Sequence, residues 1–370
     1  MNDLNTVTLS VGGHDYGGWK AVTIGAGLER QARDFTLGIT WRWPGGGDVP
    51  VRIRQGEPLE LYIGQDLLLT GYVFTTPIRY DSESITLSIT GRSKTADLVD
   101  CAAVNKPGQW RGQSVQKIVA AIAGEYAITV VNDAADTAGI DDHTIEPGET
   151  AFESIDRLLT QSRLFSTDDA QGRLVIASPG SAGRAVDTLE LGKNLLSGEA
   201  NLDFSGVFSE YISKGQRSGT DDSFGVEASE VEARITDDRI KRRRVKIIKQ
   251  SGQTTVAIAR ARVEWERANA IGRALAVNYT LQGWRQSNGA LWRHNMIVRL
   301  VDPLIGFDRD MLISEISYEL SEQGGTTAKI TVAPPETFLP EPNDAYEKRK
   351  LKKGKSSDNF EYLLPADYKP

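Results

Sequence analysis

The sequence predicts a mainly β protein with an α+β insertion, built from two related barrel-like β units and a small α+β unit. Three observations predict this class: 36 glycines, many short apolar runs separated by Gly, Pro and Asp, and few windows with helical spacing. The 370 residues exceed the size at which one hydrophobic core usually keeps growing. We therefore expect several packed units.

The first barrel-like β unit is predicted over residues 1–101. Ile85, Leu87 and Ile89 alternate with polar residues, which is the pattern of a strand with one buried face. Turn-forming residues separate this run from the other predicted strands. The strands are expected at Thr6 to Val11, Lys20 to Ile24, Phe35 to Trp41, Leu59 to Ile63, Leu67 to Phe74 and Ile85 to Thr90.

Residues 102–185 are predicted to form the small α+β unit. Apolar residues at helical spacing predict a helix over Ser114 to Gly124. Thr150 and Glu153 match a capping box at the start of a second helix. Short strands are expected beside these helices at Ala127 to Val131 and Leu174 to Ala177.

The second barrel-like β unit is predicted over residues 186–338. It includes one long helix at about residues 257–278, whose buried face is expected to hold Ala261, Trp265, Ala268, Ile271 and Leu275. The polar, acidic stretch Gly215 to Ala233 is predicted to be a mobile loop. Strands are expected at Val207 to Lys214, Lys241 to Lys249, Met296 to Val301, Met311 to Leu320 and Ala328 to Ala333.

Two distant segments share an order of three strands. Leu59 to Ile63 and the two strands after it have the order and approximate spacing of Met296 to Val301 and its two successors. Because local identity is low, a true duplication and the ordinary order of a β-meander both stay open.

Residues 339–370 are predicted to be a polar C-terminal tail. Six basic residues lie between Lys348 and Lys355. The tail is either disordered or an arm that orders on a neighbouring subunit, with Tyr346, Phe360 and Tyr362 as its anchors.

Charge and cysteine content narrow the function classes. A net charge of -7 argues against a dedicated nucleic-acid binder, which would cluster Lys and Arg against phosphates. The single cysteine, Cys101, cannot form an internal disulfide, which fits synthesis in the cytoplasm. Neither a signal peptide nor a membrane-spanning run is predicted.

No catalytic, cofactor or metal site is predicted. The three histidines, His14, His143 and His294, fall in different predicted units, and no G-x-S-x-G motif or metal-ligand spacing occurs. Asp141, Asp142 and His143 are adjacent but favour a solvated turn. A glycosidase with paired carboxylates stays open, because 50 acidic residues always permit some suitable pair.

The segment Arg239 to Lys249 holds seven basic residues in eleven. Val245 and Ile247 alternate with Arg244 and Lys246, which favours a strand with a charged outer face. A surface for an acidic protein partner and a channel wall are the alternatives. The candidate residues for either role are Arg242, Arg243, Arg244 and Lys246.

Three blocks of sequence, in order over residues 10–338, resemble the Mu-like phage baseplate hub family and, more loosely, late control proteins of other contractile-tailed phages. The first comprises Gly17-Gly18-Trp19, Phe35-Thr36-Leu37, Thr70-Gly71-Tyr72-Val73 and the most specific run, Gly91 to Cys101. The second comprises Gly148-Glu149-Thr150, Phe152, Ile155, Gly172 to Ile176 and Tyr211 to Gln216. The third comprises Trp265, Gly283-Trp284, Leu291-Trp292, Leu312-Ile313-Ser314 and the closing strand to Pro335.

The resemblance implies a non-enzymatic structural protein that needs no cofactor. In this family, three subunits form a ring of six similar β units around a channel. The ring joins the tail tube and other baseplate proteins to the central spike, and DNA passes through it during ejection. The expected location is the tail baseplate of a virion, after assembly in the host cytoplasm.

Arg92, Lys94 and Asp97, within the most specific run, are predicted to lie at a junction or a subunit interface. Two other function classes remain as alternatives. One is a tail-associated cell-wall hydrolase, and the other is a DNA-binding protein acting through Arg239 to Lys249.

Overall fold

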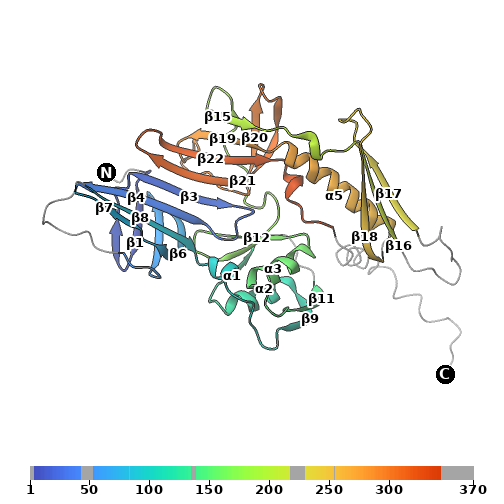
Figure 1. Cartoon of the computed structure of the whole chain (residues 1–370), viewed down its shortest axis with the longest axis horizontal. Coiled ribbons are helices and arrows are strands. Elements are labelled where there is room, and N and C mark those ends of the chain that lie inside the picture. The colour runs from blue at the N-terminus through green and yellow to red at the C-terminus, as the bar shows by residue number, and fades with distance from the viewer. Residues whose placement is uncertain are drawn as a thin grey trace.

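A computed structural model describes residues 4–42, 53–82, 84–134, 139–216, 230–253 and 255–342. The fold is mainly β, as predicted, and Figure 1 shows three parts: a large sheet, a helical unit beside it, and a small sheet crossed by a long helix. The predicted tail anchors Tyr346, Phe360 and Tyr362 and the basic run Lys348 to Lys355 lie outside the described residues.

The large sheet joins the first and last parts of the chain. Its strands follow the order β15-β19-β22-β21-β3-β4-β8-β6-β5-β1-β2, with β7 beside β8, and β20 between β14 and β21. The early strands are β1 (Val7–Val11), β2 (His14–Tyr16), β3 (Ala21–Gly27), β4 (Asp34–Arg42), β5 (Pro58–Ile63), β6 (Asp66–Thr75), β7 (Ile78–Tyr80) and β8 (Ser84–Ser93). The late strands are β14 (Leu189–Glu190), β15 (Leu195–Ala200), β19 (Val277–Gln282), β20 (Ile297–Asp302), β21 (Phe307–Ser321) and β22 (Gly325–Ala333).

Alternation of side chains builds the core of this sheet. In β5, Leu59, Leu61 and Ile63 are buried and the residues between them point outward. The same rule places apolar side chains from β3 and from β21 in a single hydrophobic core. The pairing of β3 with β21 therefore joins the two β units into one continuous body.

Two glycines allow close approach of neighbouring strands. A Cβ at Gly91 would lie 2.5 Å from the carbonyl oxygen of Tyr72, and a Cβ at Gly71 would overlap the carbonyl oxygen of Arg92. The β6–β8 pairing therefore requires glycine at both positions. Both glycines belong to the first of the three sequence blocks that resemble the family, so the close strand contact explains why these two residues occur there.

Two tryptophans of the third sequence block pack in the hydrophobic core of the large sheet. Trp284 and Trp292 are among the largest fully buried side chains. The indole nitrogen of Trp284 donates hydrogen bonds to the carbonyls of Glu319 (3.1 Å) and Thr327 (2.9 Å). The hydroxyl of Tyr318 donates to the carbonyl of Trp292. The buried polar groups of Trp284 and Tyr318 thus both have partners, as buried aromatic residues usually do.

The helical unit has its own core. Both predicted helices are present, and the predicted capping box at Thr150 and Glu153 is confirmed, with both of its hydrogen bonds formed. The expected strand at Ala127 begins three residues later, because Ala127 has a left-handed φ of 55°. Its elements are α1 (Ala96–Asp100), β9 (Gln109–Ser114), α2 (Val115–Gly124), β10 (Val130–Asn132), β11 (Gly139–Thr144), α3 (Ala151–Thr160), β12 (Phe165–Asp168) and β13 (Leu174–Ala177).

The small sheet has the order β17-β16-β18 and packs against helix α5. Part of the stretch predicted to be a loop is strand, because residues 230–233 belong to β17; residues 217–229 lie outside the described part. The elements are η1 (Phe204–Gly206), β16 (Glu210–Gln216), β17 (Glu230–Thr236), β18 (Val245–Gln253), α5 (Val256–Ala274) and η2 (Pro335–Phe338).

The long helix is shorter than predicted, and its buried face matches the prediction only in part. It ends at Ala274, and Val277–Gln282 forms strand β19 of the large sheet. Ile271 is buried as predicted, whereas Trp265 is only partly buried. The other large buried side chains are Ile258 and Val263, which were not predicted. The indole nitrogen of Trp265 donates to the carbonyl of Leu339 at 2.6 Å, so this ring holds the chain that follows η2.

The two predicted three-strand segments have the same arrangement. β5, β6 and β8 form an antiparallel meander, and β20, β21 and β22 form another. None of the helices in the described ranges combines the length and apolar character that a membrane crossing requires.

Candidate functional site

Arg92 links the end of β8 to helix α1. Its guanidinium donates hydrogen bonds to both carboxylate oxygens of Asp100, at 2.9 and 3.1 Å, and lies 5.7 Å from the centre of the Phe74 ring. Both members of the ion pair are partly exposed. Arg92 therefore ties the last residue of α1 to strand β8 of the large sheet.

Lys94 and Asp97 lie at the same junction. The backbone nitrogen of Lys94 donates to the carbonyl of Thr70 at 3.1 Å, and its side-chain stem lies close to Gly172. Asp97 is in the first turn of α1, where partial burial and then the charge of Asp100 raise the pKa of its carboxyl. These contacts are all within one chain, and a role at a subunit interface stays a prediction.

A buried polar cluster that no sequence pattern predicted lies deeper in this junction. We call Arg33, Asp168, Thr167 and His294 the junction cluster. The Asp168 side chain is only 1% exposed, and its carboxylate accepts hydrogen bonds from the backbone nitrogen of Arg33 (3.0 Å) and from Nε of Arg33 (3.1 Å). The same guanidinium donates to the carbonyls of Leu68 (2.8 Å) and Asp168 (3.1 Å).

Thr167 and His294 extend the cluster to the second β unit. Oγ1 of Thr167 and Nε2 of His294 are 3.0 Å apart, so β12 is bonded to the segment that precedes β20. Burial, together with the charges of Arg33 and Arg293, lowers the pKa of His294 to about 3. The histidine is therefore neutral at ordinary pH and joins its own segment to β12 without adding charge.

This neutral histidine predicts an acid-sensitive junction. An unfolded histidine has a pKa of about 6.5, so between that value and about 3 the unfolded state binds one proton more than the folded state. Above about pH 6.5 the low pKa of His294 costs no stability. Below it, the free energy of unfolding falls by up to about 1.4 kcal/mol per pH unit. Burial raises the pKa of Asp168, which acts in the opposite direction in this range. Urea unfolding at pH 7 and pH 4 measures the total loss.

His294→Gln is the matched control for this pH effect, because glutamine can keep the bond to Thr167 and does not titrate. The variant keeps Arg33, Arg293 and Asp168. The contributions of these residues to the pH dependence of the free energy of unfolding therefore largely cancel when the two proteins are compared. The wild-type protein should lose about 3 kcal/mol more than the variant between pH 7 and pH 4. Equal losses in the two proteins would contradict the assignment.

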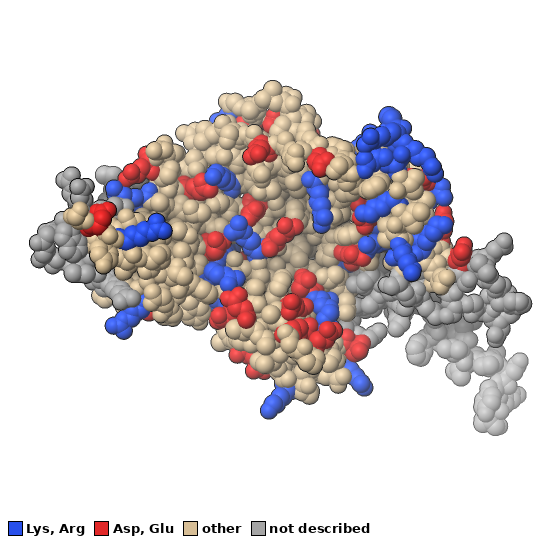
Figure 2. Space-filling model, in the orientation of Figure 1, with Lys and Arg blue, Asp and Glu red and all other residues tan. Residues whose placement is uncertain are grey.

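The predicted basic residues form a surface cluster on the small sheet. Figure 2 shows Lys and Arg side chains gathered over the part that holds β16, β17 and β18. Lys241, Arg242 and Arg243 are exposed in the connection between β17 and β18. Arg244 is held back, because its guanidinium lies 4.9 Å from the centre of the Phe208 ring and bonds to the carbonyl of Ser205.

The predicted faces of strand β18 are wrong. Lys246 is ion-paired with Glu266 of helix α5, whereas Ile247 is 63% exposed. The expected alternation assumed that charged side chains point away from the protein. Lys246 instead points toward helix α5, because the carboxylate of Glu266 provides an ion-pair partner for its ammonium group there.

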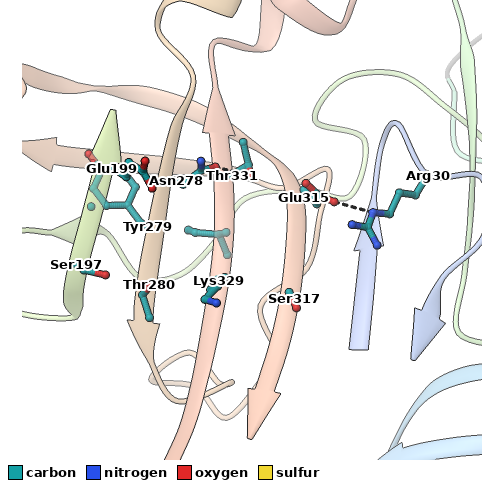
Figure 3. Close-up of a pocket in the computed structure, with 12 residues that line it drawn as sticks. Arg30, Ser197, Glu199, Asn278, Tyr279, Thr280, Glu315, Ser317, Lys329 and Thr331 are labelled. Atoms are coloured by element: carbon teal, nitrogen blue, oxygen red, sulfur yellow. Dashed lines mark hydrogen bonds and ion pairs between the residues drawn. The ribbon is translucent and has the colours of Figure 1, made fainter. Parts of the chain in front are cut away.

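A polar groove crosses the outer face of the large sheet (Figure 3). Its volume is about 600 Å³. Oγ1 of Thr331 donates to Oδ1 of Asn278 at 2.8 Å, and Arg30 forms an ion pair with Glu315 at 2.6 Å. We call this surface the polar sheet face; its polar residues are Arg30, Ser197, Glu199, Asn278, Thr280, Glu315, Ser317, Lys329 and Thr331.

One serine and one histidine meet inside the helical unit. Nε2 of His143 and Oγ of Ser154 are 2.9 Å apart, but Ser154 has no exposed surface and His143 is 3% exposed. A substrate therefore cannot reach this serine in the folded protein. Across the ranges that the structure describes, no three His, Cys, Asp or Glu side chains are grouped to hold a metal ion.

Three family models match successive parts of the chain. The N-terminal domain of the Mu phage baseplate assembly protein GpP-like family matches residues 6–93. The second domain of the baseplate hub protein gp44-like family matches residues 95–178, and the fourth domain of the Mu phage baseplate assembly protein GpP matches residues 255–341.

Individual proteins are similar over nearly the whole chain. The baseplate hub protein gp44 of Escherichia phage Mu is 31% identical over 373 residues, which covers 98% of this chain and 96% of that protein. The 43 kDa tail protein of prophage MuSo2 from Shewanella oneidensis is 31% identical with a TM-score of 0.81, over 91% of this chain and 100% of the other.

A tail protein from Neisseria meningitidis MC58 shares the fold, with a TM-score of 0.75 and 22% identity over 90% of this chain and 98% of the other. The matched models follow the order of the predicted sequence blocks, and the identity to the Mu protein extends over almost the full length. The chain therefore belongs to the Mu-like phage baseplate hub family.

Proposed function

We propose that this chain is the structural baseplate hub of a contractile phage tail. Three copies form a ring that joins the tail tube to the central spike and is needed for tail assembly. The observation that carries this proposal is the alignment with the Mu baseplate hub protein gp44 over 98% of the chain. Its location is then the virion baseplate, after synthesis in the host cytoplasm.

The arrangement of the sheet supports a ring. Each chain places two β units side by side in one sheet, so three chains supply six such units. Closed symmetry is the usual way in which β-rich subunits avoid free sheet edges.

We assign the channel wall to the polar sheet face rather than to the basic cluster. Among the residues of this face, Arg30 and Lys329 balance Glu199 and Glu315, and the remaining side chains are mostly hydroxyls and amides. A surface with balanced charges lets DNA pass, whereas a basic wall would hold the phosphates.

The basic cluster then serves as a contact for an acidic surface of a neighbouring baseplate protein. Its exposed residues include the predicted Arg242 and Arg243, with Arg244 and Lys246 beside them. For the domain organisation we propose the predicted boundaries after residues 185 and 338, and we move the first boundary to a point before α1, because Leu98 of this helix packs in the core of the helical unit. Arg92 and Lys94 then lie just before that boundary and Asp97 just after it.

A reconstruction of the assembled tail tip tests the proposal. The expected result is density for this chain on the tail axis, between tube and spike, with threefold symmetry. Density away from the axis would refute the hub assignment. Peptidoglycan cleavage by the purified chain would favour a cell-wall hydrolase instead, and salt-sensitive duplex binding would favour a DNA-binding protein.

A further inference from the structure

The small sheet has an edge strand with an exposed apolar side chain near its centre. β18 is the last strand in the order β17-β16-β18, so one of its edges pairs with no strand in the described part of the chain (Figure 1). Ile247 of this strand is 63% exposed. At the opposite edge, the apolar residues Val231 and Ala233 of β17 are buried against α5 instead. The edge of β18 is therefore the better candidate for pairing with another chain.

The pairing with β16 determines which backbone groups of β18 are free. The carbonyl of Arg244 accepts a hydrogen bond from the backbone nitrogen of Glu210 at 3.0 Å. Backbone groups alternate in direction along a strand, so Lys246 and Ile248 also bond to β16. The N–H and C=O groups of Ile247, and of the residues two positions away, then point to the open edge. An incoming strand would pair there without disturbing the existing sheet.

Cations without a partner surround this edge. Lys241, Arg242 and Arg243 are exposed immediately before β18, and Lys249 is exposed within it. No hydrogen bond or ion pair joins these four side chains to another described residue. The carboxylates of this part of the chain are mostly ion-paired already. The edge therefore presents uncompensated positive charge beside its open backbone groups.

The segment that carries three of these cations is fixed at both ends. Oγ of Ser209 donates to the carbonyl of Arg244 at 2.8 Å and accepts from the backbone nitrogen of the same residue at 2.8 Å. At the other end, Ile240 packs in a small apolar cluster with Ile271 of helix α5. The cations between these two anchors are thus held ready for a partner, which lowers the entropy cost of binding.

The charge and the open backbone groups together select the kind of partner. A second copy of this chain, paired through β18, would bring the cations of both copies together, which is unfavourable. Nucleic acid would use the cations but neither the open backbone groups nor Ile247. An extended protein segment with carboxylates uses all three features.

We propose that β18 accepts an extended acidic segment of another protein as an added strand. Backbone hydrogen bonds join the segment to the open edge, an apolar side chain of the segment packs beside Ile247, and its carboxylates lie next to Lys249 and Arg243. Ile247 and Lys249 line a groove of about 670 Å³ on the small sheet, which leaves room for these side chains. That the partner is a baseplate protein rests on the proposed hub function.

Binding of a synthetic peptide to the full chain tests the pairing. The probe is the capped peptide Glu-Thr-Glu-Thr-Val-Thr-Glu-Thr-Glu, whose palindromic order suits either strand direction, and the comparison peptide has lysine in place of glutamate. Fluorescence anisotropy should show saturable binding of the glutamate peptide, at least about tenfold tighter than that of the lysine peptide. Hydrogen exchange of the β18 amides should slow when the glutamate peptide binds.

Two pairs of variants separate the backbone contact from the charge contact. Ile247→Pro removes the outward N–H and keeps the bonds to β16, so it should weaken binding at least about tenfold, whereas Ile247→Val should stay within about threefold of wild type. Lys249→Glu should weaken binding at least about fivefold. Lys117→Glu, the same change at an exposed position of α2, should have no effect. Unchanged circular dichroism establishes that each variant folds.

Several results would overturn the proposal. They are no saturable binding of the glutamate peptide, equal affinity for the two peptides, or an unchanged affinity in folded Ile247→Pro or Lys249→Glu. Self-association that Ile247→Pro abolishes would assign the edge to a second copy instead. Peptide binding that appears only after residues 343–370 are deleted would assign it to this chain's own C-terminal residues.

The hub function is judged separately, by where the wild-type chain lies in tails. A chain on the tail axis that does not bind the glutamate peptide would overturn the strand addition alone. A chain that binds this peptide through β18 but is absent from the axis would overturn the hub function alone.

Discussion

Arg33→Leu is expected to lower the free energy of unfolding by about 3–5 kcal/mol. The substitution leaves the Asp168 carboxylate, whose side chain is 1% exposed, without its cation. It also removes the donors to the carbonyls of Leu68 and Asp168. Urea unfolding monitored by tryptophan fluorescence measures the loss.

Two comparisons isolate the buried charge. Asp168→Asn added to Arg33→Leu removes the unpaired carboxylate and should recover part of the lost stability. Arg299→Leu breaks a surface pair with Asp308, whose side chains are 41% and 70% exposed, and should cost less than about 1 kcal/mol. If Arg33→Leu and Arg299→Leu cost the same, the junction cluster does not stabilise the fold.

Gly71→Ala is expected to disrupt the first β unit, with a loss of about 3 kcal/mol or more. The added methyl group would overlap the carbonyl oxygen of Arg92, which is backbone and cannot rotate away. The β6–β8 pairing must separate to admit it, and the register between Gly71 and Ser93 would be lost. Thermal unfolding and hydrogen exchange of the strand amides measure the effect.

Gly124→Ala is the matched control for the same chemical change. A Cβ at Gly124 meets no atom within 4 Å, and this glycine is the last residue of helix α2. Alanine there should be neutral or should stabilise by up to about 1 kcal/mol, because it restricts the unfolded chain and favours helix. A loss at Gly124 similar to that at Gly71 would show that the contact with Arg92 is unimportant.

Local patterns predicted most strands and two helices correctly. Alternating residues such as Ile85, Leu87 and Ile89 identify β8, and Thr150 with Glu153 identifies the start of α3, because these signals are contained in a few adjacent residues. Strand β19 was missed because Leu275 continues the helical spacing of α5. Its pairing with β22 is a distant contact that outweighs this local preference.

The junction cluster could not be predicted, for a related reason. Arg33 and Asp168 are 135 residues apart, and each lies in a stretch with several other charged residues. Only the folded chain brings them together and buries them. The run Gly91 to Cys101 lies in the surrounding region, where Arg92 forms an ion pair with Asp100.

The bonds of Arg33 have a mechanical consequence. Its guanidinium donates to main-chain oxygens of β6 and β12, and these atoms move only when their strands move. A change in the curvature of the large sheet must therefore either carry the helical unit along with it or break these bonds. Because these bonds fix the helical unit to the sheet, bending of the β units would displace the helices as one body.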